Sequence, residues 1–214
     1  MYLPSDMTFQ YFFFDTYYGY FLQALPIALL ACVIYVIVKR KRQPQLSPGR
    51  ALLSALFVCY LAGLLCLTLF YYVLGDAYYW LFYHMSSGSG SHWFSFEYNF
   101  TPDFWNDLTS ERLGNILLFL PFGILYPLFD RKATWTRTLL TGVVTSVVIE
   151  LLQPIFGRSF DINDIILNSM GVVVSASVFF ILHRIISNAR KYSLQGTTQG
   201  RYLTGGVPPV RFSM

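Results

Sequence analysis

Five long apolar segments constrain this chain more than any other feature of its sequence. Glu150 is the one charged residue within them, and a helix of about 20 apolar residues is long enough to cross a bilayer. With 55% hydrophobic and 12% charged residues, the chain also differs from an ordinary soluble domain. The sequence therefore predicts an all-α membrane protein with five transmembrane helices. The segments cover residues 17–38, 51–74, 113–129, 139–156 and 165–182.

The third apolar segment leaves two interpretations open. Its 17 residues, 113–129, rise only about 25 Å as a helix. Pro121 also removes a backbone hydrogen bond from its interior. The segment forms either a complete span or a re-entrant hairpin.

The distribution of charge favours five complete spans. If the N-terminus lies outside, 13 of the 15 Lys and Arg residues fall on the cytoplasmic side, and Arg112 and Arg158 are the two outside. The positive-inside rule predicts such an asymmetry. A re-entrant third segment would move Arg131, Lys132 and Arg137 to the other side. We therefore expect the N-terminus outside and the C-terminus in the cytoplasm.

Four regions follow from this topology. Residues 1–50 hold an aromatic segment and the first span, and residues 51–97 hold the second span and an outer loop with a flexible Ser/Gly linker. Residues 98–186 form a core with the last three spans. Residues 187–214 are polar and lack hydrophobic periodicity, which predicts a disordered cytoplasmic tail.

Residues 150–171 place polar side chains between two apolar spans. A charged side chain near the centre of a membrane helix costs about 2.5 to 3.5 kcal/mol, so such residues usually serve a function. Glu150 and Gln153 lie one turn apart on the fourth span. Asp164, Asn168 and Gly171 share one face of the fifth span at helical spacing. A tight loop between the two spans should bring these faces together near the outer surface.

The outer end of the third span adds an arginine and an amide at the same depth, which predicts a polar site built from three spans. Arginines at this depth can bind a phosphate or pyrophosphate head group, and a carboxyl group removed from water can act as acid or base. The candidate catalytic residues are Glu150, Asp161 and Asp164, and the candidate binding residues are Arg112, Asn115, Gln153, Arg158 and Asn168.

These residues also have structural interpretations. Asp161 or Asp164 can cap the last helix and complement its dipole. Glu150 can be a protonated or Arg-paired residue that holds helices together. Gly171 and Ser175 fit the small-residue pattern of close helix packing, which we favour for this pair.

Other site classes lack a sequence signal. There is no nucleophile motif, phosphate loop or zinc-type spacing, and the spacing of His84, His92 and Glu97 is not diagnostic of a metal site. The basic residues lie in separate short loops, which does not suggest a nucleic-acid partner. We therefore predict no metal, no cofactor and no nucleic acid. The sequence leaves catalysis and oligomeric state open.

Two stretches resemble the VanZ-like membrane protein family. They are NILLFLPFGIL at residues 115–125 and ELLQPIFGRSFDINDIILNSMG at residues 150–171, with E-x-x-Q, R-x-x-D-x-x-D and N-x-x-G elements in that order. The resemblance covers roughly residues 98–175. Two departures are Ser175, where a second glycine is often expected, and the sequence NFTPDFW from Asn99 onward.

The resemblance implies a multi-pass protein of the bacterial cytoplasmic membrane. For the founding member it also implies lowered sensitivity to teicoplanin-type lipoglycopeptides. Our first functional hypothesis is that an outer-leaflet pocket, surrounded by membrane lipids, binds or modifies an anionic lipid-linked cell-wall intermediate. The second is a structural cluster beside an outer loop that binds a partner protein. A small transporter is less favoured, because the polar groups gather at one face and not at the midplane.

Overall fold

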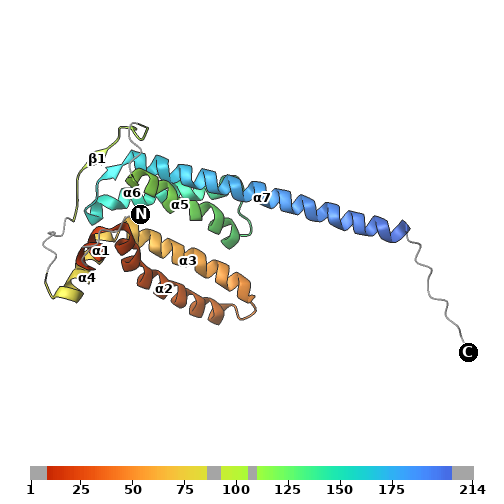
Figure 1. Ribbon diagram of the computed structural model, residues 1–214, viewed down its shortest axis with the longest axis horizontal. Helices are drawn as coiled ribbons and strands as arrows, with labels where there is room; N and C mark the ends of the chain where they lie inside the picture. The colour runs from red at the N-terminus through yellow and green to blue at the C-terminus, as the bar shows by residue number, and fades with distance from the viewer. Residues whose placement is uncertain (1–8, 86–92, 106–109, 204–214) are drawn as a thin grey trace, which may run out of the picture. The chain divides into compact units, whose positions relative to one another are not determined.

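The computed structural model describes residues 9–85, 93–105 and 110–203. The predicted Ser/Gly linker at residues 86–91 and His92 lie outside this range. The chain divides into two compact units, Met1–Ala176 and Ser177–Met214. Figure 1 shows that the first unit is built mainly from helices, and two short strands pair at one end of it.

Within the described residues, five helices are long and apolar enough to cross a membrane, which confirms the predicted fold class. The third segment forms one continuous helix from Ser110 to Phe129, and no re-entrant hairpin interrupts this described stretch. The hydroxyl of Tyr60 donates to the carbonyl of Leu118 (2.9 Å), beside the turn that Pro121 disturbs. The five helices are α2 (Tyr17–Arg42), α3 (Pro48–Thr68), α5 (Ser110–Phe129), α6 (Trp135–Leu152) and α7 (Ile162–Leu203).

Local sequence signals explain where these helices begin and end. Thr16 caps α2 by accepting from the Gly19 amide, and Thr134 caps α6 by accepting from the Arg137 amide, both at 3.2 Å. Pro48 occupies the first turn of α3, where its missing N–H has no cost. Helix α6 passes into a 3-10 turn, η1 (Gln153–Phe156), which ends at Gly157 with φ = 82°.

The second span is shorter than its apolar run, because the chain turns after Thr68. The amides of Leu69 and Phe70 both donate to the carbonyl of Leu65, which closes α3. The aromatic residues that follow form α4 (Tyr71–Tyr83), and those before the first span form α1 (Phe9–Asp15). Edge-to-face ring contacts join α1 to α4, for example Phe13 with Tyr78 at 5.4 Å between ring centroids.

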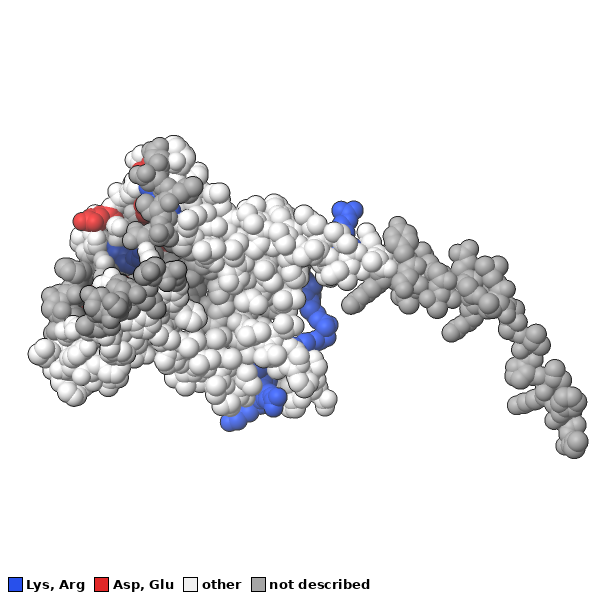
Figure 2. All heavy atoms as spheres, in the orientation of Figure 1, with Lys and Arg blue, Asp and Glu red and all other residues white. Residues whose placement is uncertain are grey.

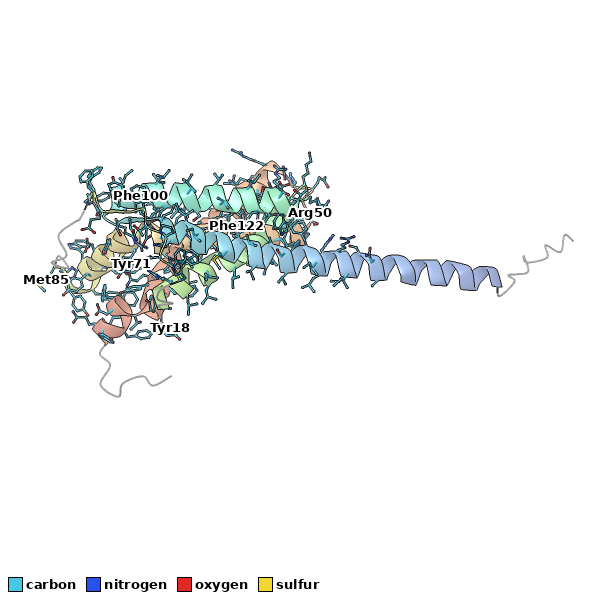
Figure 3. The ribbon with its side chains drawn as sticks, turned by 90° about the horizontal axis from the view of Figure 1, so that it is seen from above. Tyr18, Arg50, Tyr71, Met85, Phe100 and Phe122 are labelled. Carbon is cyan, nitrogen blue, oxygen red and sulfur yellow. The ribbon has the colours of Figure 1, made fainter. Side chains whose placement is uncertain are left out.

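The core of the first unit lies between α3, α5, α6 and α7. Phe119 and Val172 are fully buried there, and Phe122, labelled in Figure 3, stacks on Tyr126. Glycines allow the helices to approach closely: a Cβ on Gly171 would collide with the carbonyl oxygen of Ile116. This close approach agrees with the packing interpretation of Gly171.

The first unit carries charge at its two ends. Strands β1 (Tyr98–Asn99) and β2 (Phe160–Asp161) mark one end, which we call the strand end. Figure 3 places Arg50, in the first turn of α3, at the opposite end from Phe100. Figure 2 shows acidic side chains near the strand end and uncharged surface between the ends. This separation follows the charge pattern behind the predicted topology, and the orientation of the termini stays a prediction.

The second unit contains the rest of α7, which continues to Leu203. The structure therefore differs from the disordered tail expected from Ser187 onward. Ala189, Lys191 and Gln195 favour a helix, and extending an existing helix is easier than starting a new one. Residues 204–214 lie outside the described range.

Candidate functional site

The strand end brings together segments that are distant in the sequence. Strands β1 and β2 pair in parallel, with Tyr98 opposite Phe160 and Asn99 opposite Asp161. The amide of Phe160 donates to the carbonyl of Glu97 at 3.0 Å. This pairing holds the segment before α5 against the stretch between α6 and α7, which carries Gln153, Arg158 and Asp161.

Glu150 is completely buried at the last turn of α6. Its Oε1 accepts from the backbone amide of Asp161 at 2.6 Å. With the Gln153 amide oriented so that its nitrogen faces the carboxylate, this nitrogen lies 3.0 Å from each carboxylate oxygen. Glu150 of α6 and Gln153 of η1, predicted as neighbours, are therefore in contact, and Glu150 holds the β2 backbone against α6.

Asp161 caps the last helix and belongs to a wider network. Its Oδ1 accepts from the backbone amide and the side-chain amide of Asn163, both at 2.8 Å, and from Nδ2 of Asn99 at 3.2 Å. The first of these bonds is the capping role considered from the sequence. The other two show that the same carboxylate also binds two side-chain amides.

Asn163 is the centre of this network, and it was not among the predicted site residues. Its side chain is 1% exposed. Its Oδ1 accepts from the amides of Asp103 (2.8 Å) and Phe104 (3.1 Å), and its Nδ2 donates to the carbonyl of Thr101 (3.0 Å) as well as to Asp161. One side chain thus fixes the segment before α5 against the beginning of α7.

The two predicted residues of α5 bind different acids. Nδ2 of Asn115 donates to Oδ1 of Asp164 at 2.6 Å, so this pair joins α5 to α7 as expected. Arg112 instead forms an ion pair with Asp103 at 3.0 Å and also donates to the Asp103 carbonyl. Arg112 therefore holds the segment before α5, a role that the sequence did not suggest.

Arg158 lies between η1 and β2 and reaches toward the end of α3 and the beginning of α4. Its Nη1 donates to the carbonyl of Thr68 at 3.2 Å, at the end of α3. Burial raises the pKa of Tyr71, as does the hydroxyl of Tyr20, while the charge of Arg158 acts in the opposite direction. Tyr71 therefore stays a neutral hydrogen-bonding group at physiological pH. A guanidinium carries five N–H donors, so Arg158 can bind a further acceptor beside Thr68.

Asn168 lies deeper along α7 and contacts α6. Its Nδ2 donates to Oγ of Ser146 at 3.0 Å, and both side chains are buried. Its Oδ1 is buried with no hydrogen-bond donor among the described residues. Ser146 precedes Glu150 by one helical turn, so its place on the polar face of α6 was visible in the sequence.

The predicted residues gather at the strand end but do not all contact one another. Glu150 contacts Gln153 of η1 and Asp161 of β2, and Asn115 of α5 contacts Asp164 of α7. Asn168 lies one turn deeper on α7, and Arg158 contacts the end of α3. Arg112 pairs with Asp103. Asn99, Asp103, Ser146 and Asn163 complete the network without having been predicted. Ser146 could have been found from its spacing to Glu150, whereas Asn99 and Asp103 lie in an irregular segment and Asn163 contacts that segment, so helical spacing gave no signal for these three.

The site combines a buried frame with partly exposed charged groups. Glu150, Asn163 and Asn168 are buried, whereas Arg158, Asp161 and Asp164 are half-buried. The half-buried groups can contact a ligand: the guanidinium can bind phosphate oxygens, and carboxylates can accept from hydroxyl groups. Among the described residues, no group of three or more His, Cys, Asp or Glu side chains is placed to hold a metal ion.

The comparisons with known proteins agree with the sequence resemblance. The VanZ/LLP1 family matches residues 27–183, which is most of the chain and includes every residue of the candidate site. The searches of curated proteins and of solved structures gave no match. Because the family match covers more than half of the sequence, the chain belongs to the VanZ/LLP1 family.

Proposed function

We propose that this protein binds an anionic lipid-linked cell-wall intermediate at the outer leaflet of the bacterial cytoplasmic membrane. Through this binding it lowers sensitivity to teicoplanin-type lipoglycopeptides. The observation that carries the proposal is the placement of half-buried Arg158, Asp161 and Asp164 on a hydrogen-bonded frame at the end of the spans. Such an intermediate offers phosphate oxygens to the arginine and sugar hydroxyls to the carboxylates.

The roles of the candidate residues follow from their contacts. Arg158 binds the phosphate or pyrophosphate. Asp161, Asp164 and Asn115 contact the sugar, and Glu150 with Gln153 keeps the β2 backbone in place. Asn168 stabilises the contact of α6 with α7. Arg112 acts indirectly, by fixing the segment before α5 through Asp103. If a chemical step takes place, Glu150, Asp161 and Asp164 are the candidate acids and bases.

The test is to purify the protein with its bound lipids and to compare Arg158→Ala with Arg137→Ala. Arg137 is an exposed arginine of α6 that pairs with Asp130, away from the candidate site. Losing a charged hydrogen bond of about 1.5 to 3 kcal/mol should reduce the co-purified isoprenoid phosphate about ten- to hundredfold in Arg158→Ala only. Cells with equal membrane levels of Arg158→Ala should regain lipoglycopeptide sensitivity. Equal lipid content in both variants would refute the proposed head-group site.

A partner protein that binds the outer segment is the second candidate. Phe100 and Trp105 are 69% and 63% exposed beside the strand end, and aromatic side chains often anchor protein interfaces. In this case, replacing both by serine should abolish the effect on lipoglycopeptide sensitivity without changing protein level or bound lipid. Unchanged sensitivity in this double variant would exclude the second candidate.

A further inference from the structure

An apolar groove lies beside the polar site, at the strand end of α6. Its volume is about 250 Å³, below the roughly 300 to 1,000 Å³ of sites that enclose a whole small ligand. The groove therefore has room for part of a larger molecule. One wall is formed by Phe94 and Phe96, from the segment before β1, and by Tyr98 of β1. The other is formed by Leu151 of α6, Ile155 of η1 and Phe160 of β2.

Backbone hydrogen bonds hold the wall of the groove in place. The amide of Ser95 donates to the carbonyl of Pro154 at 2.9 Å, and the amide of Phe94 donates to the carbonyl of Ile155 at 3.3 Å. Phe94 has φ = 63°, a left-handed conformation that is uncommon for a bulky residue. Although this backbone is fixed, the side chains of Phe94 and Phe96 remain 60% and 77% exposed.

The groove continues an apolar stripe that runs along α6 into η1. Val144, Val148, Leu151 and Ile155 follow one another at helical spacing and are 59%, 48%, 60% and 39% exposed. In a membrane span, such an exposed stripe contacts lipid tails. A hydrocarbon chain that lies along the stripe reaches the groove without leaving an apolar surface.

Residues of the groove are also direct sequence neighbours of residues in the polar site. Leu151 directly follows Glu150, and Phe160 directly precedes Asp161. From this adjacency we propose that the groove binds the part of the lipid-linked intermediate's hydrocarbon chain that lies next to its head group. This inference rests on the proposed function for the identity of the head group. The continuity with the lipid-facing stripe supports a hydrocarbon chain as the occupant of the groove.

The experiment uses the full-length protein in lipid nanodiscs and a polyprenyl phosphate with a photoactivatable diazirine in its chain. We expect labelling of residues 94–98 and 151–155 that unlabelled polyprenyl phosphate displaces. Leu151→Trp fills the groove, and Leu140→Trp is its matched control, since Leu140 is also 60% exposed on α6. The larger side chain in Leu151→Trp should exclude about two methylene groups of the lipid from the groove and so lower labelling about tenfold. Labelling of Leu140→Trp should equal that of the parent.

Phe96→Ser provides a second test that adds no bulk. It removes an exposed side chain from the wall and should also lower labelling, with the thermal stability of the protein unchanged. Labelling as in the parent for both Leu151→Trp and Phe96→Ser would overturn the inference. If Arg158→Ala alone lost the label, the proposed function would stand without the groove. If the groove variants lost the label and Arg158→Ala kept it, the inference about the groove would be supported and the proposed head-group site would be refuted.

Discussion

Replacing Asn163 with alanine should lower the free energy of unfolding by about 3 to 5 kcal/mol. The side chain makes four hydrogen bonds at 2.8 to 3.1 Å, to Asp103, Phe104, Thr101 and Asp161. A net value of about 0.5 to 1.5 kcal/mol for each of the four bonds gives about 2 to 6 kcal/mol, and the expected loss lies in the middle of this range. Thermal unfolding of the purified protein in detergent measures the loss.

Asn188→Ala is the matched control, because Asn188 is an exposed asparagine on the same helix, α7. We expect its stability to stay within about 0.5 kcal/mol of the parent. Limited proteolysis adds a local measurement: the segment of residues 93–105 should become sensitive in Asn163→Ala before the spans unfold. Equal stability and equal protease resistance of the two variants would show that the network around Asn163 contributes little.

Gly171→Leu should destabilise the protein by about 3 kcal/mol or more, at the upper end of overpacking effects. A Cβ at this position would collide with the Ile116 carbonyl oxygen and approach Cβ of Phe119 to 3.3 Å. Since the first obstacle is backbone, the new side chain cannot fit unless α5 and α7 separate. The same unfolding measurement applies, together with the yield of monodisperse protein.

Gly114→Leu is the control for this substitution. Gly114 lies on α5, the helix that Gly171 of α7 packs against, and a Cβ on Gly114 would meet no atom within 4 Å. Replacing a helix glycine in open space should be neutral or slightly stabilising, by up to about 1 kcal/mol. Similar losses for Gly114→Leu and Gly171→Leu would mean that glycine itself, and not the close helix approach, is required.

The spans were predictable because hydrophobic length and charge placement are strong signals. Pro121 made the third span ambiguous, and α5 resolves this by beginning at Ser110, before the apolar run. The end of the second span was not predictable, because Leu69 and Phe70 are as apolar as the residues before them. The extension of α7 beyond Ser187 was missed because polar composition gives no measure of how far an established helix propagates.

The candidate site was predictable where residues share a helix face. Glu150 and Gln153, or Asp164 and Asn168, follow from helical spacing alone. The pairing of Arg112 with Asp103 was not predictable, since it depends on how the segment before α5 folds back. Asn163 was missed for a related reason: three of its four hydrogen-bond partners lie in the segment before α5, which has no regular spacing, so no sequence period points to them.

The pairing of β1 with β2 also bears on the order of events during synthesis. Asn163 and Thr101, like Asn99 and Asp161, are 62 residues apart in the chain. Contacts between distant residues form late, because the intervening chain must first be made and brought together. The strand end therefore cannot close until α5 and α6 have been inserted, and until then residues 93–105 have no β2 to pair with. A nascent chain that stalls before Phe160 should be recognised by quality-control proteases even when its first four spans are in the membrane.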